Sequence, residues 1–248
     1  MRSTVHLGAT SLAADTPSKR LHGKIELVMP PLVAASRRFL NHPLIREAYA
    51  EFLIAVHGII RASVPLMRNA LQCARDMSGD QVADGLAPYL ERHIEEELGH
   101  DVWVLEDLEV LGVERSSVLA RVPTPAVARL VGAQYYWALQ YHPVAVLGYL
   151  AVFEGYPPAP PLIEKLRTRT GLPPAAFRTL EEHAVLDPSH GDELDDVIDS
   201  LSLSREQEEV LGLSSMSSVE LMARCIDDVC DVVDGGDGSG SAGAVYFV

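Results

Sequence analysis

Two stretches of the chain repeat one spacing: a histidine, three residues, a carboxylate, two residues and a second histidine. The two sets are His93, Glu97 and His100 and, ninety residues later, His183, Asp187 and His190. At about 100° per residue, positions i, i+4 and i+7 lie on one face of a helix. The pattern therefore favours a helix for both stretches. It predicts that each stretch aims two imidazoles and one carboxylate at a single point.

The rest of the chain is also patterned as helix. Apolar residues recur every three or four positions almost throughout, and strand signals are scarce. We expect helices over residues 24–40, 43–77, 81–111, 125–154, 162–170, from 174 onward, and 204–233 with a break near Gly212. Six or seven long helices with short connections indicate one all-α bundle domain over residues 24–233. Residues 1–23 and the Gly/Ser-rich residues 234–248 are expected to be flexible segments.

Composition excludes several classes of protein. The formal net charge is -15, and nucleic-acid binding is not expected because phosphate contacts need clustered Lys and Arg. No stretch reads as a signal peptide or as a membrane span, so no membrane association is expected. The three cysteines offer neither a disulfide framework nor a zinc-ribbon spacing. This usage favours a reducing compartment, which predicts a cytoplasmic protein.

Each of the two histidine–carboxylate–histidine stretches would present its imidazoles and carboxylate on one helical face. If two such faces met inside a helical protein, they would form a nitrogen- and oxygen-rich site for one or two transition metals. Glu97 and His100 are three residues apart, a spacing that projects a carboxylate able to bridge two metals and an imidazole to the same side. Glu96 lies four residues before His100 and competes for the ligand role. An exposed acidic face would explain the glutamates, but it would not explain His93 and His100 among apolar neighbours.

The second stretch contains Pro188, which removes a backbone donor and should kink or restart the helix. Asp187 and Pro188 have an alternative reading as the N-cap and first residue of a new helix. Glu154 ends an apolar run, where a glutamate opposes the helix dipole and needs a partner if it is buried. A metal ion would be such a partner. His142 precedes a proline at an expected kink and is interpreted as structural.

These residues resemble a known family. The pair Glu97 and His100, then Glu154, then the set of His183, Asp187 and His190 occur in the order and rough spacing of haem-oxygenase-like non-haem iron oxidases and oxygenases. The surrounding segments resemble the "iron-containing redox enzyme" branch, over roughly residues 40–205. The resemblance implies a haem-oxygenase-like bundle of about seven helices with all six residues as metal ligands.

The resemblance also implies a function. Members bind Fe(II), two ions per chain, and use dioxygen as co-substrate to oxidise a small molecule such as an amino acid, an amine or a fatty acid derivative. The reactions are N-oxygenation, carbon–carbon cleavage or desaturation. A homodimer and an external electron donor are further expectations from this analogy.

The chain departs from the family at one place. The family usually supplies another glutamate from an early helix, whereas the segment HGIIRASVPLM here offers His57 and Arg61 but no acid. His57 would be a substitute ligand or a substrate contact, and His93 would be another replacement donor. Arg61 would bind a substrate carboxylate if it faces the site. One iron or two therefore both stay open.

Two other functions stay open beside an oxygenase. A haem-binding or haem-degrading protein of the same fold would use His57 as axial ligand, although porphyrin iron needs only axial donors and not a carboxylate-rich set. A non-catalytic iron-binding or interaction protein would follow if loss of the early glutamate has abolished the chemistry.

Overall fold

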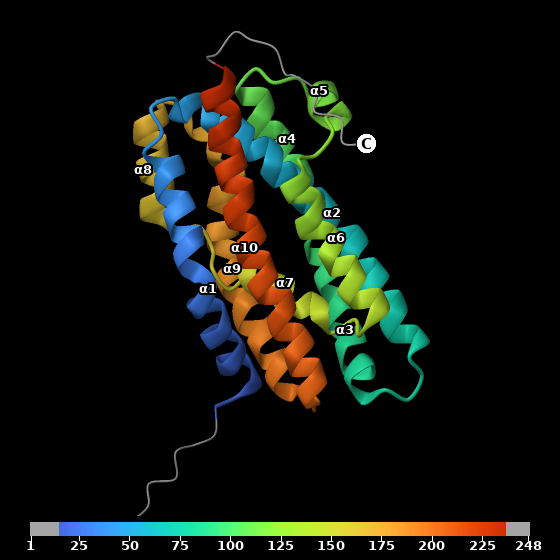
Figure 1. The fold of residues 1–248 in the computed structure, drawn as a ribbon. Coiled ribbons are helices and arrows are strands. Elements are labelled where there is room, and N and C mark those ends of the chain that lie inside the picture. The colour runs from blue at the N-terminus through green and yellow to red at the C-terminus, as the bar shows by residue number, and fades with distance from the viewer. Residues whose placement is uncertain (1–14, 237–248) are drawn as a thin grey trace, which may run out of the picture.

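The computed structural model describes residues 15–236, and every regular element in that range is a helix (Figure 1). The elements in chain order are α1 (Pro17–Leu40), α2 (Ile45–Asp76), α3 (Gln81–Glu96), α4 (His100–Val110), α5 (Arg115–Ala120), α6 (Pro125–Gln140), α7 (Ala145–Phe153), α8 (Pro160–Thr170), the 3-10 helix η1 (Pro174–Phe177), α9 (Arg178–Ser200) and α10 (Arg205–Gly236). The expected all-α bundle is confirmed. Most of the two expected flexible segments lies outside the described residues.

The first helix begins earlier than expected. Thr16 caps α1, its hydroxyl accepting from the Lys19 backbone N–H, and Pro17 occupies the first turn, where a missing N–H costs nothing. Leu21 is buried in the core. The domain boundary expected at residue 24 is therefore wrong, because the preceding turns of α1 belong to the bundle. At the other end α10 continues to Gly236, past the expected limit at residue 233.

Helices α1 and α10 run side by side along one flank of the bundle (Figure 1). Helix α10 passes through Gly212 without the expected break. A Cβ at Gly212 would approach within 2.7 Å of Lys24 Nζ, which donates to the Glu208 carbonyl. The glycine thus makes room for a side chain from α1 and does not end the helix.

The expected helix over residues 81–111 is divided. The backbone N–H of Glu97 donates to the His93 carbonyl and ends α3, and Gly99 has a φ of 91°. Residues other than glycine rarely adopt that conformation. Helix α4 then starts at His100 in a new register, so His93 and His100 no longer share one helical face.

The expected helix over residues 125–154 is also divided, into α6 and α7. Helix α7 is buried on all sides from Ala145 to Val152. It packs closely on α10, where a Cβ on Gly148 would collide with the Leu211 carbonyl. Glu154, immediately after α7, is consequently held inside the protein, with 7% of its surface exposed.

Helix α2 is the one helix of the described residues that is long and apolar enough, by length and composition alone, to cross a membrane. In the structure it packs against α3, α4, α6 and α10. One helix of this kind is weak evidence for a membrane span, because a helix in the core of a bundle can be equally long and apolar.

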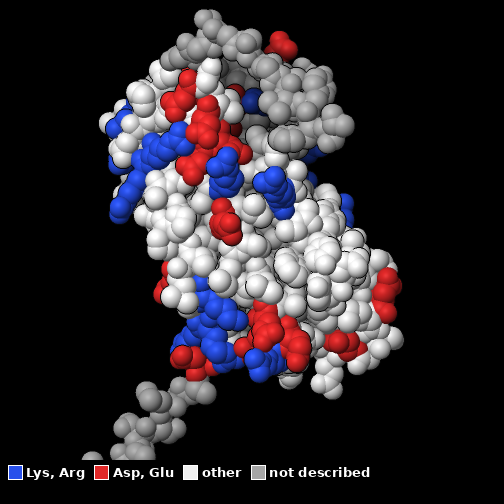
Figure 2. Space-filling view, viewed as in Figure 1, with Lys and Arg blue, Asp and Glu red and all other residues white. Residues whose placement is uncertain are grey.

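Charged side chains of both signs are mixed on the face shown in Figure 2. Arg38 lies beside Asp227, Asp231 and Asp234, and Arg20 pairs with Glu208. The basic side chains named here are thus paired with acids. The expectation that the chain does not bind nucleic acid remains a prediction.

Candidate metal centre

Helix α9 carries three of the expected ligands, and its N-terminus is anchored by a carboxylate from α4. The buried Asp107 accepts from the backbone N–H groups of Arg178 (3.2 Å) and Thr179 (2.9 Å). Unpaired N–H groups at a helix N-terminus are satisfied in this way by an acidic side chain. This contact fixes the first turn of α9 against α4, and therefore the position of His183 one turn later.

Helix α9 continues through Pro188 without restarting. Asp187 is therefore not the N-cap of a new helix, and the alternative reading of this residue is wrong. His183 and His190 are seven residues apart, which separates their backbones by about 10 Å along the helix axis. The two histidines consequently serve two different positions along α9.

The first position is formed by Glu97, His100 and His183, which offer ligand atoms all within 4.8 Å of one another. His100 Nδ1 lies 3.1 Å from Glu97 Oε2. His183 Nδ1 donates to the Thr179 carbonyl at 2.7 Å, which leaves Nε2 free to bind a metal. The ring of His100 stacks on Trp103, with centroids 4.1 Å apart.

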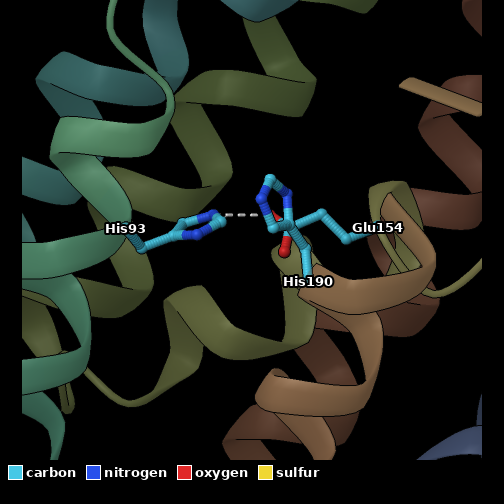
Figure 3. A group of neighbouring side chains, drawn as sticks. All are labelled: His93, Glu154 and His190. Carbon is cyan, nitrogen blue, oxygen red and sulfur yellow. Dashed lines mark hydrogen bonds and ion pairs between the residues drawn. The ribbon is translucent and has the colours of Figure 1, made fainter. Parts of the chain in front are cut away.

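The second position is formed by His93, Glu154 and His190, again with ligand atoms within 4.8 Å (Figure 3). His93 Nε2 lies 2.8 Å from Glu154 Oε1. Figure 3 shows His93 reaching in from α3, opposite Glu154 and His190. Each histidine–carboxylate–histidine stretch thus contributes one histidine to each position, and the expected convergence of each stretch on one point is wrong.

Asp187 lies in neither group of three. Asp187 is buried, and it lines a cavity of about 310 Å³ together with Glu154 and Glu97, whose negative charges act on its carboxyl group. Burial, followed by the charges of those two carboxylates, raises its pKa to about 8. A cation between the two positions would offset this accumulation of negative charge.

The polar atoms of the site lack partners in a way that fits a metal. Glu154 Oε2 and the Nδ1 atoms of His93, His100 and His190 are buried without a hydrogen bond to any described residue. Burial raises the pKa of Glu154. Burial also acts to raise the pKa of Glu97, but the contact with His100 and the charges of His100, His93 and His183 together lower it. Buried carboxylates with imidazoles on either side form a donor set that suits iron and similar metals.

A cavity of about 310 Å³ reaches this donor set. Glu97, Glu154, His183 and Asp187 line it at the metal centre. The remaining lining comes from α1, α2, α7, α8, α9 and α10 and is mostly aliphatic or aromatic, including Leu32, Phe52, Ile60, Met67, Phe153 and Leu162. The described lining contains no Lys or Arg. The centre therefore opens onto an apolar chamber.

Comparison with known proteins assigns the chain to a family. Residues 79–217, more than half of the chain, match the family described as "Iron-containing redox enzyme". The chain belongs to this family. No curated protein matches the chain.

Several solved structures have the same fold as this chain. A domain of unknown function with a heme oxygenase-like fold from Shewanella denitrificans OS217 has a TM-score of 0.78 at 21% identity, over 92% of this chain and 97% of that one. A TenA homolog from Pseudomonas syringae pv. tomato DC3000 has 0.69 at 15%, over 93% and 98%. Heme oxygenase-2 from Synechocystis sp. PCC 6803, solved with heme and NO, has 0.62 at 17%, over 90% and 89%.

His57 and Arg61 do not lie at the candidate metal centre. Both line a separate cavity of about 40 Å³ beside Glu51 and Arg121. That volume accommodates only one or a few water molecules. The structure does not bring His57 or Arg61 to the metal groups or to the large cavity. His57 as a substitute ligand or haem axial ligand, and Arg61 as a substrate contact, are therefore not supported.

The structure adds residues that the spacing pattern did not identify. Asp107 accepts a hydrogen bond from the backbone of α9, and the Thr179 carbonyl accepts one from His183. The ring of Tyr89 stacks on His93. Thr179 and Tyr89 each lie four residues before the histidine they contact, so the helical spacing could have indicated them. Asp107 is 72 residues from Thr179 in the sequence, and its role depends on the packing of α4 against α9, which no spacing pattern indicates.

Proposed function

We propose that this chain is a non-haem iron oxidase or oxygenase that uses dioxygen to oxidise a small apolar molecule. The observation that carries the proposal is the placement of two imidazole–carboxylate groups, Glu97–His100–His183 and His93–Glu154–His190, at an apolar cavity. Iron held by such donors with open coordination positions supplies the reaction of dioxygen with a bound substrate. Electrons beyond those of the substrate would come from an external donor.

The protein residues divide the remaining tasks. The Thr179 carbonyl holds His183 in one orientation, and Asp107 holds the helix that carries it. The apolar walls exclude water from the centre and position the substrate by shape. Asp187 faces the cavity with a raised pKa, so it can hold or release a proton beside the bound substrate.

The lining of the cavity favours one class among the expected substrates. A free amino acid carries two charges, and a buried charge needs a partner. The lining offers no Lys or Arg for a carboxylate remote from the metals. We therefore favour a substrate with an aliphatic or aromatic body whose single polar group lies at the metal centre, such as a fatty acid derivative or a long-chain amine.

Metal loading followed by oxygen exposure tests the proposal. Protein loaded anaerobically with Fe(II) is expected to bind iron and, with a reductant and a long-chain amine or fatty acid, to consume dioxygen. His183→Gln should abolish dioxygen consumption and Fe(II) binding at the Glu97–His100–His183 group. The matched control is His42→Gln, because His42 is also buried but contacts Asp234 far from the centre.

Two results would overturn the proposal. Iron binding without dioxygen consumption by the loaded protein, across long-chain amines and acids, would indicate a non-catalytic iron-binding protein. A Soret band on haem titration that survives His183→Gln, together with no Fe(II) binding, would indicate a haem protein.

A further inference from the structure

The segment HIEEELGH has a mirror arrangement around its centre. His93 and Glu96 are three residues apart, and Glu97 and His100 repeat the pair in reverse order. Each pair lies at one of the two metal positions: His93 at the second and both Glu97 and His100 at the first. Glu96 is the one residue of these two pairs that belongs to neither of the two candidate metal positions, so its role is still to be explained.

His93 is held from several directions. Its Nε2 faces Glu154 Oε1 at 2.8 Å, and its Nδ1 faces Glu96 Oε2 at 3.5 Å. The ring of Tyr89, one turn earlier on α3, stacks on it with an interplanar angle of 12°. With 1% of its surface exposed, His93 has almost no freedom to turn. A side chain fixed so closely, with one nitrogen aimed at a buried carboxylate, has the environment of a metal ligand.

The Nδ1 atom of His93 has no hydrogen-bond partner among the described residues, and 3.5 Å is slightly long for one. A small rotation of the half-exposed Glu96 side chain would close that gap. Glu96 Oε2 also lies 3.9 Å from His190 Nε2, so the carboxylate borders both imidazoles of the second position. The neighbouring Glu95 is exposed and has the same charge.

His183 provides a precedent within the same centre. Its Nδ1 donates to the Thr179 carbonyl, which presents Nε2 to the first position. Metal-binding histidines regularly donate their second ring N–H to a carbonyl or carboxylate, which fixes the tautomer and strengthens the ligand. Glu96 stands to His93 as Thr179 stands to His183, with a charged acceptor in place of a neutral one.

We propose that His93 binds a second metal ion through Nε2, and that Glu96 is the positioning residue that accepts the proton of His93 Nδ1. The second position is then complete with His93, Glu154 and His190 and needs no glutamate from an early helix. The inference rests on the proposed iron-dependent function for the identity of the metal. The family resemblance already implies two metal ions per chain, and the new content is the dependence of the second ion on the pair of His93 and Glu96.

Anaerobic titration with Fe(II), and with Co(II) as a spectroscopic probe, tests the proposal by counting ions per chain. The unaltered chain is expected to bind two, and His93→Ala to bind one. Glu96→Gln should weaken the second ion about tenfold and Glu96→Ala up to about a hundredfold, because orienting carboxylates contribute on this scale. The first ion should be unaffected in all of these variants.

Glu95→Gln and Glu95→Ala are the matched controls, since they remove the same charge one residue away from an exposed position. Equal weakening by the Glu95 and Glu96 variants would reduce the role of Glu96 to general charge and would overturn the proposal. So would unchanged second-ion affinity in Glu96→Ala, or a single ion in the unaltered chain. A readout separate from affinity is the ¹⁵N shift of His93 in Zn(II)-loaded protein, which should report a protonated Nδ1 that Glu96→Ala perturbs.

The outcomes separate this inference from the proposed function. Two ions with the expected dependence on Glu96, but no dioxygen consumption, would leave the inference standing and refute the oxidase or oxygenase. Dioxygen consumption that is insensitive to Glu96→Ala and His93→Ala, with one ion bound, would refute this inference. It would leave the proposed oxidase or oxygenase standing.

Discussion

The imidazole rings of His93 and His190 meet edge to face, with their centroids 5.2 Å apart. His100 and His183 meet in the same way at 5.2 Å. Each contact joins α9 to a different side of the break between α3 and α4. The break is therefore the structural reason that the donors form two positions.

Replacing Gly99 by alanine tests the importance of the break. A residue other than glycine at φ 91° is strained, and we expect a loss of about 1–3 kcal/mol in the free energy of unfolding. Because relief of that strain would shift His100 relative to α3, metal affinity at the first position should also fall. Thermal unfolding and Fe(II) titration measure the two effects.

The control is Gly79→Ala. Gly79 has a φ of 85° and, like Gly99, open space around its missing Cβ, but it precedes α3 at the end away from the ligands. It should show a similar loss of stability with unchanged metal affinity. If the two variants behave alike toward metal, the break does not position His100.

The metal-free protein should become less stable as the pH rises from 7 to 9. Burial, followed by the charges of Glu154 and Glu97, raises the pKa of Asp187 to about 8 in the folded protein, against 3.8 ordinarily. Burial lowers the pKa of His93, but the hydrogen bond to Glu154 and the charges of Glu154, Glu97 and Glu96 together raise it to about 9, against 6.5 ordinarily. The folded state thus retains protons that the unfolded state has released, and stability decreases with pH in this window. Metal binding displaces those protons, so metal affinity should increase over the same range.

Melting temperatures of chelator-treated protein across this range provide the measurement. Asp187→Asn removes one of the two titrating groups and should flatten the dependence. A melting temperature that rises between pH 7 and 9, or a slope unaltered by Asp187→Asn, would contradict the assignment.

Asp107→Ala should destabilise the protein by about 1–3 kcal/mol, because two backbone N–H groups at the start of α9 lose a charged acceptor. It should also weaken metal binding at the first position, since His183 lies one turn later. Asp80→Ala is the counterpart: Asp80 caps α3 through two backbone N–H groups but lies far from the ligands along that helix. Chemical denaturation should show comparable losses, with reduced metal affinity in Asp107→Ala alone.

Filling the cavity should block substrate without affecting the metals. Ile60 lines the cavity from α2, and a tryptophan there would occupy part of its about 310 Å³. We expect Ile60→Trp to weaken binding of decanol, a neutral aliphatic probe, at least about tenfold, or 1.4 kcal/mol, in calorimetry on Zn(II)-loaded protein. Leu27→Trp, at a position 79% exposed on α1, should bind decanol normally. Normal binding by Ile60→Trp would place the substrate elsewhere.

Much of the fold could be predicted from the periodicity of apolar residues, because the buried face of an amphipathic helix is visible in the spacing of neighbouring residues. The sequence also indicated six candidate metal ligands from residue type and spacing: Glu97, His100, Glu154, His183, Asp187 and His190. The error lay in treating residues 81–111 as one helix. A single glycine at Gly99 looks like any tolerated helix glycine until its backbone conformation is known.

His57 and Arg61 are residues that the sequence suggested for the site and that the structure places elsewhere. Their types and spacing suit a ligand and a substrate contact, yet α2 presents them to a small separate cavity. Which face of a long buried helix meets which neighbour depends on the packing of all the helices together.

The sequence by itself determined the helical class, because the periodicity of apolar residues is a short-range property. Its motifs also carried the resemblance to the family, and its residue types and spacing indicated which side chains are candidates to bind a metal. Only the tertiary structure decided how those residues are shared between two positions. It also placed His93 in the second and joined an apolar cavity to both. These depend on contacts between distant segments of the chain: His93, Glu154 and His190 lie between 36 and 97 residues apart and have no fixed spacing.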